Sequence, residues 1–288
     1  MGTCEPGFGF VVLHYLAPEM TRRCVDALLQ MHWNASVVIV DNASPDGSGA
    51  VLKAEYAAKK EVTVLCNPSN LGFARGNNVG YDYLVKKGGC NFIVVMNNDV
   101  IIDDPLFPGK VAEIYSQTAF AVLGPDVLNP VSGIHQSPVS LESFKESDLR
   151  EVDGRYAGYL RNYYWKRFKW SLKKALLHSG PKKHKPAVFY TGRMEGAVLH
   201  GACFVFSEIF ISARPYCFNP STFMYLEEGI LQFECMRDGL KMVYDPSLRV
   251  LHFEDVSTDV AFGSEARKDR FKFEQTRKSI AVLLDLMK

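Results

Sequence analysis

The stretch that decides the fold is residues 92–99, with the sequence FIVVMNND. Its first five residues are apolar and rich in β-branched side chains. An unbroken apolar run of this length is typical of a strand buried on both faces of a parallel sheet. Ligands bind at the carboxyl ends of such strands, so Asn97, Asn98 and Asp99 stand where a ligand would be met. A turn that caps the next segment is the alternative interpretation of this triplet.

Strands and helices alternate around this stretch. We expect strands over 9–16, 36–40, 62–66 and 92–96 and helices over 20–31, 50–58 and 72–85. This alternation predicts an α/β fold with a doubly wound, mostly parallel sheet. Further along, we expect strands over 121–123, 198–206, 241–244 and 248–252 and helical segments over 105–116, 223–236 and 267–287. The last of these is amphipathic, and we expect it to pack against the domain.

Composition limits the classes of protein to which the chain can belong. The chain has 288 residues, of which 47% are hydrophobic, so it can bury a full core and is not a disordered protein. The net charge of +1 argues against a globally basic nucleic-acid binder. The seven cysteines include no C-x-x-C pair, which indicates neither a zinc site nor a disulfide framework. No apolar run is long enough to span a bilayer and no secretory signal is present, so we expect a cytoplasmic location.

One block of the chain is strongly basic. Residues 155–185 contain no acidic residue and mix Lys and Arg with Tyr, Trp and Phe. This mixture is typical of a segment on an anionic membrane surface, so we expect peripheral attachment to the inner face of the plasma membrane. Binding of nucleic acid, binding of a sugar phosphate and a solvated face beside a core stripe are the alternatives.

The predicted edge of the sheet collects acidic groups. Its polar residues are Asp41, Asp99, Glu227, Glu228 and His252, with Arg75 nearby at a helix start. So many acids predict a divalent cation, Mg²⁺ or Mn²⁺, that bridges protein carboxylate to a pyrophosphate. A remaining carboxylate can then take a proton from an attacking hydroxyl, which predicts group transfer from a nucleotide-activated donor. A dinucleotide-dependent redox enzyme is not favoured, because no G-x-G-x-x-G follows the first strand.

Six motifs stand out along the chain. They are VIVDNAS at 38–44, NPSNLGFARGNN at 67–78, MNNDV at 96–100, GAC at 201–203, FMYLEE at 223–228 and VLH at 250–252. With these motifs in the same order, residues 8–257 resemble the inverting, metal-dependent family 2 glycosyltransferases with the GT-A fold. The resemblance is strongest to the rhamnosyltransferase-like branch of bacterial polysaccharide assembly.

The resemblance implies roles for individual residues. Asp99 and His252 would be the metal ligands, and Glu228 the general base, with Glu227 as the alternative. The nucleotide-binding residues would be His14, Asp41, Asn42, Ser44, Gly72, Arg75, Asn78, Asn97 and Asn98. For His14, a core histidine is the alternative interpretation. The chain departs from the family pattern at Asn97, which replaces the first acid of the D-x-D motif, and at Glu228, which replaces an Asp.

The function implied is transfer of a sugar, from dTDP-rhamnose or a UDP-sugar, to a hydroxyl of a glycan or a lipid-linked saccharide. We expect one GT-A domain with a nucleotide-sugar half (1–130), an acceptor-side half with a smaller sheet (131–258, including the basic block) and a terminal helix (259–288). We expect a homo-oligomer and no nucleic-acid partner. A nucleotidyltransferase, a non-catalytic nucleotide-sugar-binding protein and a nucleic-acid-binding role for the basic block are the alternative functions.

Overall fold

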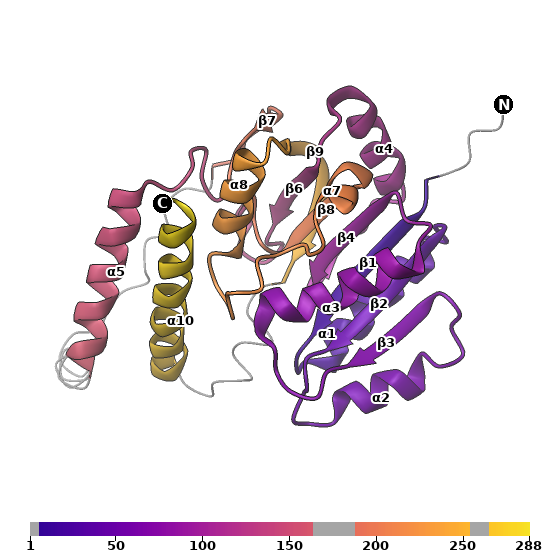
Figure 1. Cartoon of the computed structure of the whole chain (residues 1–288). Helices are drawn as coiled ribbons and strands as arrows, with labels where there is room; N and C mark the ends of the chain where they lie inside the picture. The colour runs from indigo at the N-terminus through magenta and orange to yellow at the C-terminus, as the bar shows by residue number, and fades with distance from the viewer. Residues whose placement is uncertain (1–5, 164–187, 254–264) are drawn as a thin grey trace.

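Strand β4 (Phe92–Asn97) lies inside a nine-stranded sheet of the computed structural model, between β1 (Phe8–His14) and β8 (Cys203–Ser207). The structure describes residues 6–163, 188–253 and 265–288. Helices cover both faces of the sheet (Figure 1), and the apolar side chains of β4 divide between the cores on the two faces. The prediction that this strand is buried on both faces is therefore confirmed.

The first half of the chain forms the parallel part of the sheet. β1 pairs in parallel with β4 and with β2 (Ala35–Asp41), which pairs with β3 (Val62–Cys66). The connecting helices are α1 (Pro18–Gln30), α2 (Ser48–Glu55) and α3 (Gly72–Lys87). These bounds lie within a few residues of the expected ones, and the predicted α/β fold class is confirmed.

The parallel strands reach their polar residues at the same edge. His14 at the end of β1 pairs with Asp41 of β2, and the preceding residue, Leu13, pairs with Asn97 of β4. Side chains from three strand ends are therefore neighbours, although they are far apart along the chain.

The second half of the chain extends the same sheet. β6 (Val122–Leu128) pairs antiparallel with β8 and parallel with β9 (Met242–His252). The short strands β5 (Val100–Ile101) and β7 (Met194–Glu195) pair antiparallel with β9. The strands expected to form a separate, smaller sheet instead continue the main one, in the order β3-β2-β1-β4-β8-β6-β9-β5.

β9 is one long strand where two short strands were expected. Its pairing with β6 is irregular between Pro125 and Asp126, where residues 246–248 of β9 have no partner in the ladder. Beyond this irregularity the pairing resumes and continues to the end of β9. His252 then pairs with Val100 of β5, directly after Asp99, so the last residue of β9 lies at the end of β4.

The other helices of the described residues are α4 (Phe107–Thr118), α5 (Glu146–Arg161), α7 (Glu208–Ala213), α8 (Glu227–Arg237) and α10 (Glu265–Leu286). Figure 1 shows α5 and α10 side by side, with α8 between α10 and the sheet. Leu149 of α5 and Ile280 of α10 share a small apolar core with Ile230 of α8. Arg277 of α10 also pairs with Asp153 of α5 at 2.8 Å. The terminal helix therefore packs against the domain as predicted, whereas α5 was not predicted.

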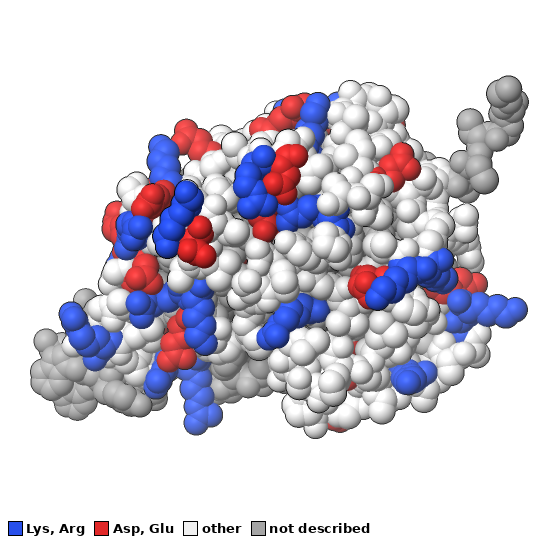
Figure 2. Space-filling model, viewed as in Figure 1, with Lys and Arg blue, Asp and Glu red and all other residues white. Residues whose placement is uncertain are grey.

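The basic block falls mostly outside the described residues. Residues 155–163 belong to the end of α5 and the residues just after it, and residues 164–187 are not described. On the face that carries α5 and α10, Figure 2 shows Lys and Arg interspersed with Asp and Glu. Among the helices of the described ranges, none is long and apolar enough to cross a membrane.

Gly72 provides a test of how closely α3 approaches the chain ahead of α8. Its φ of +79° lies in the left-handed region, and a Cβ there would lie 2.2 Å from the carbonyl oxygen of Phe223. We expect Gly72→Ala to lower the free energy of unfolding by at least about 1–2 kcal/mol, because the backbone conformation alone costs that much for a residue with a Cβ. Urea denaturation measures the change.

The matched control is Gly47→Ala ahead of α2, where φ is likewise left-handed, at +76°, but a Cβ meets nothing within 4 Å. That substitution should lower the free energy of unfolding by the backbone cost alone, about 1–2 kcal/mol, and Gly72→Ala should lower it further. Equal effects of the two substitutions would contradict the close contact at Gly72.

Candidate active site

Asp99 lies in the turn after β4 and points a carboxylate oxygen at His252. Asp99 is 5% exposed, and within the described residues its Oδ1 has no hydrogen-bond partner. His252 Nε2 lies 3.3 Å from this oxygen. The amide of Phe253 donates to the carbonyl of Asp99 at 3.0 Å, which holds the end of β9 against the triplet. The structure thus brings the two predicted metal ligands together.

Two residues that the sequence analysis did not single out adjoin His252. Gln136 Oε1 lies 2.8 Å from His252 Nδ1. The ring of His200 lies 5.5 Å from the ring of His252, and its Nδ1 accepts a hydrogen bond from the amide of Ala202 at 3.2 Å. Burial, with His252 as a second cause, lowers the pKa of His200 to about 3, so this ring is neutral. His200 directly precedes the G-A-C motif, which could have drawn attention to it, whereas Gln136 lies in a loop with no motif.

The Asp99 and His252 pair fits a divalent cation. A buried carboxylate oxygen without a hydrogen bond, facing an imidazole nitrogen, is an electron-rich pair of the kind that cations occupy. In the part of the chain that the structure describes, no group of three or more His, Cys, Asp or Glu could hold a metal ion. Mg²⁺ is commonly held by one or two carboxylates together with substrate phosphates, so a small set of protein ligands suits a cation shared with a nucleotide.

Glu227 and Glu228 open α8 after a strained turn. Tyr225 and Leu226 both have left-handed backbones, with φ of +74° and +72°, which non-glycine residues adopt only when the surroundings enforce it. Glu228 Oε2 lies 3.8 Å from the position that a Cβ on Gly201 would take. The next residue, Ala202, accepts a hydrogen bond from the amide of Asn97 at 3.0 Å. Glu228 therefore borders the same strand ends as the Asp99 and His252 pair.

The two glutamates differ in their surroundings. Glu227 is 5% exposed and its Oε1 has no hydrogen-bond partner among the described residues. Burial, and then the charge of Glu228, raise the pKa of Glu227 to about 8, so it keeps its proton at neutral pH. Glu228 is half-buried. Burial raises its pKa as well, while the nearby charge of Lys272 opposes that rise.

Helix α10 supports the strained turn from outside. The ring of Phe271 meets the rings of Phe223 and Tyr225 edge-on, at 6.0 and 6.4 Å between centroids. Ser279 donates a hydrogen bond to the carbonyl of Met224 at 3.3 Å. α10 therefore contacts the segment that positions both glutamates.

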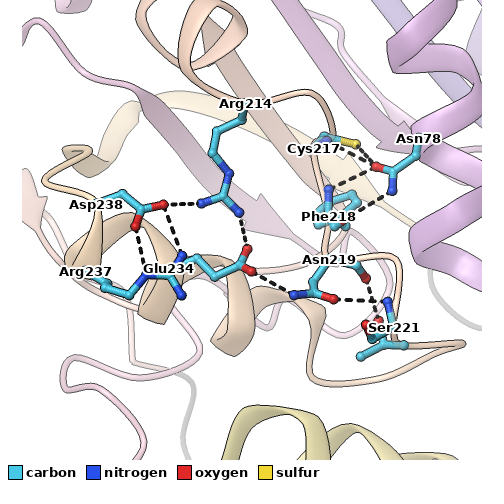
Figure 3. Close-up of polar contacts among 10 residues, drawn as sticks. Asn78, Arg214, Cys217, Phe218, Asn219, Ser221, Glu234, Arg237 and Asp238 are labelled. Carbon is cyan, nitrogen blue, oxygen red and sulfur yellow. Dashed lines mark hydrogen bonds and ion pairs between the residues drawn. The ribbon is translucent and has the colours of Figure 1, made fainter. Parts of the chain in front are cut away.

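An ion-pair network holds α8 itself in place (Figure 3). Arg214 pairs with the buried carboxylate of Glu234, and with Asp238 at 2.6 Å. Asn219 donates to the other oxygen of Glu234 at 2.7 Å. Removing one partner of a buried pair is costly, because it leaves the other charge unpaired. This network fixes the helix from the end opposite the two active-site glutamates.

Two predicted nucleotide-binding amides are fully engaged inside the protein. The Asn78 side chain accepts from the amides of Cys217 and Phe218 at 3.1 and 3.0 Å, and donates to the carbonyl of Phe218 at 2.7 Å (Figure 3). The Asn42 side chain is bound in the same way by groups of the 67–72 loop. Both residues fix loops of the site rather than offering free polar atoms to a ligand.

His14 is another predicted nucleotide contact that the structure places inside. It is 0% exposed, with Nδ1 2.7 Å from the Thr21 hydroxyl and Nε2 2.8 Å from the Ser48 hydroxyl. Burial lowers the pKa of His14, although the charge of Asp41 opposes the shift. Asn98 donates to the same Thr21 hydroxyl at 3.0 Å, so His14 and Asn98 belong to one buried network. The geometry matches the alternative interpretation, a core histidine.

The remaining predicted residues lie at the ends of β2 and β4 and on α3. The carboxylate of Asp41 accepts from the amide of Ser44 at 3.0 Å, and a Cβ on Gly49 would lie 2.0 Å from its other oxygen. The Ser44 hydroxyl accepts from the amide of Leu16 at 3.0 Å. Arg75 is exposed on α3, and Asn97 is half-buried at the end of β4.

Comparison with known proteins places the chain in a family. Residues 10–173 match the model of "Glycosyl transferase family 2". No match was found among curated proteins. The fold is similar to that of GalNAc-T7, solved with UDP, GalNAc and Mn²⁺, with a TM-score of 0.57 and 14% identity over 86% of this chain and 44% of that one. The chain thus spans less than half of the GalNAc-T7 chain.

A second similar structure is the mannosyltransferase PcManGT from Pyrobaculum calidifontis, in complex with GDP-Man and Mn²⁺. Its TM-score is 0.56 and its identity 10%, over 99% of this chain and 75% of that one. At these identities the likeness supports the shared fold, while the family rests on the match over residues 10–173. The chain belongs to glycosyl transferase family 2 and has the GT-A fold.

Proposed function

We propose that this protein transfers a sugar from a nucleoside diphosphate donor to a hydroxyl group, with inversion at the anomeric carbon. The observation that carries the proposal is that the Asp99 and His252 pair and Glu228 border the same strand ends of a family 2 fold. A cation-binding site and a half-buried carboxylate at the same strand ends are the two groups that such a transfer requires.

Asp99 and His252 would hold Mg²⁺ or Mn²⁺, which when bound neutralises the diphosphate that leaves the sugar. Both similar structures were solved with Mn²⁺, which agrees with this choice of cation. Arg75 and Asn97, which the fold leaves accessible, are candidates for direct contact with the nucleotide. Asp41 and Ser44 would shape the loop that receives the nucleotide base. The buried side chains of His14, Asn42 and Asn98 would hold that loop and the strand ends in place. Gly72 would allow α3 to begin there, and Asn78 would fix α3 against residues 217 and 218.

Glu228 is the proposed general base. It would take the proton from the acceptor hydroxyl while the acceptor oxygen bonds to the anomeric carbon. The bond from that carbon to the diphosphate oxygen breaks on the opposite face, so the configuration inverts. Glu227 is the weaker candidate for this role, because its raised pKa keeps it protonated at neutral pH.

The donor and acceptor are proposed by class. A UDP-sugar or dTDP-rhamnose as donor, and a glycan or lipid-linked saccharide of bacterial polysaccharide assembly as acceptor, are proposed from the resemblance to the rhamnosyltransferase-like branch. UDP and GDP-Man are the nucleotide ligands of the two similar structures. A thermal-shift screen of UDP-, GDP- and dTDP-sugars with Mn²⁺ identifies the donor, since a ligand present far above its Kd stabilises the fold measurably.

The proposed organisation keeps 1–130 as the nucleotide-sugar half, 131–258 as the acceptor-side half and 259–288 as the terminal helix of one domain. Attachment to an anionic membrane surface through 155–185 is proposed on the composition of that block alone.

Replacing the proposed base should separate catalysis from binding. In Glu228→Gln we expect turnover to fall by about two to four powers of ten with unchanged nucleotide affinity, because a positioned base contributes about that much. Glu227→Gln is the matched control, and it should keep most of the turnover because it imitates a carboxyl that is already protonated. Assays should measure released nucleoside diphosphate, since pyrophosphate would indicate a nucleotidyltransferase. The reverse ranking of the two variants would make Glu227 the base.

Asp99→Asn should test the proposed cation-binding site, because the substitution removes the charge of the side chain and keeps its shape. We expect Mn²⁺ to strengthen nucleotide binding to the wild-type protein and to do so far less in this variant. Calorimetric titrations of UDP and GDP with and without Mn²⁺ measure the difference. Equal strengthening by Mn²⁺ in both proteins would remove Asp99 from the site.

Glu227 should make stability depend on pH. Its pKa rises from 4.5 to about 8 on folding, so between these values the unfolded chain ionises while the folded protein keeps the proton. The free energy of unfolding of the wild type should therefore fall as the pH rises through this window, by at most about 1.4 kcal/mol for each unit of pH. Urea denaturation of wild type and Glu227→Gln should show the variant gaining on the wild type from pH 5 to pH 8. A constant difference would contradict the raised pKa.

A further inference from the structure

Gln136 contacts His252 at the ring nitrogen that does not face Asp99. Its Oε1 lies 2.8 Å from His252 Nδ1. The backbone around it is held on both sides, since the Gln136 amide donates to the carbonyl of Val127 at 2.8 Å and the Val139 amide donates to the carbonyl of Val198 at 2.8 Å. The carboxamide is therefore presented to the ring by chain that is tied to β6 and to the segment ahead of β8.

This contact fixes where the proton of His252 lies. A carboxamide oxygen carries no hydrogen, so the ring nitrogen must donate, and Nδ1 bears the proton. The neutral ring then has its lone pair on Nε2. His200, the neighbouring ring, cannot replace Gln136 as the acceptor. Its Nδ1 already accepts from Ala202, and in the neutral ring the other nitrogen carries the proton.

The consequence appears at Asp99. His252 Nε2 lies 3.3 Å from Asp99 Oδ1, and that oxygen is buried and has no hydrogen bond among the described residues. In the neutral ring, a lone pair on nitrogen then faces a lone pair on oxygen, and both residues are 5% exposed. Such an arrangement is unfavourable until a positive charge, either a second proton on the ring or a metal cation, lies at the two atoms.

We propose that Gln136 is a positioning residue, which holds His252 in the tautomer with the proton on Nδ1 and thereby directs Nε2 at a divalent cation shared with Asp99. The cation part of this inference rests on the proposed function, whereas the tautomer does not. A hydrogen bond from the second ring nitrogen of a ligating histidine orients the ring and commonly contributes about 10–100-fold to metal affinity.

The experiment compares three variants with the wild type. Gln136→Leu removes the acceptor and keeps the shape, and Gln136→Glu keeps an oxygen in the same place. Gln117→Leu on α4 is the matched control, because Gln117 Oε1 also accepts a hydrogen bond, from Arg193, and this contact does not involve His252.

Mn²⁺ alone is titrated and followed by electron paramagnetic resonance of the free ion. Nitrogen-15 spectra of the histidine rings report the tautomer in metal-free protein. The His252 signals are assigned by their loss in His252→Asn.

We expect wild type, Gln136→Glu and Gln117→Leu to keep the proton on Nδ1 and to bind Mn²⁺ with similar or, for the glutamate, higher affinity. Gln136→Leu should lose the single tautomer and bind Mn²⁺ about 10–100-fold more weakly. Unchanged tautomer and affinity in Gln136→Leu would overturn the proposal. So would a wild-type spectrum with the proton on Nε2, a result that does not depend on any variant folding. If the wild type takes up no Mn²⁺ but shows the expected tautomer, the cation fails and the positioning role of Gln136 stands.

Discussion

The pairing of Val100 with His252 is the constraint on which the site depends. It is a contact between the short strand after the Asn97-Asn98-Asp99 triplet and the last residue of β9. β9 reaches this point only because it lies parallel to β6, which is joined through β8 to the buried strand β4. The carboxylate of Asp99 and the ring of His252 therefore meet through the ladder of the sheet and not through a flexible loop. A site built on strands in this way keeps its geometry without a bound ligand.

The site combines several arrangements that would destabilise a protein if they stood alone. Within the described ranges, Asp99 and Glu227 each bury an oxygen without a hydrogen bond, and Tyr225 and Leu226 adopt left-handed backbones. Each arrangement costs free energy, which the apolar cores on both faces of the sheet offset. The ion pairs of Arg214 act on the same helix as the strained turn, so α8 is fixed at one end while its other end carries the strain. This distribution is typical of functional sites, where local cost is accepted for a fixed geometry.

The parallel half of the fold was predictable because its signals are local. Strands such as residues 92–97 are continuous apolar runs, and helices such as α1 show an apolar stripe. β5 and β7 have only two residues each, which is too short for any periodicity, and they exist through pairing with β9. Contact between distant segments, rather than local preference, decides these two strands. α5 differs, because Leu149, Val152, Tyr156 and Leu160 form an apolar stripe with helical spacing that the sequence analysis missed.

The same distinction holds for the site. Asp99 and Glu228 stand in motifs and could be named as candidates from the sequence, whereas Gln136 meets the distant residue His252 only through the fold. For His14, Asn42 and Asn78 the residue type suggested a ligand contact, and the coordinates show polar atoms already bound by neighbours. Whether a polar side chain is free or engaged depends on the satisfaction of its hydrogen bonds, which a sequence does not record.

The contact of α10 with the turn at 223–226 has a consequence for how this protein can diverge. Phe271 and Ser279 contact the segment just ahead of the two glutamates, so the proposed acceptor side draws on two parts of the chain that are well separated in sequence. A chimera that takes one of these parts from a relative would place a foreign helix against a native turn. Swaps of acceptor preference should therefore succeed only when both segments are exchanged as a unit.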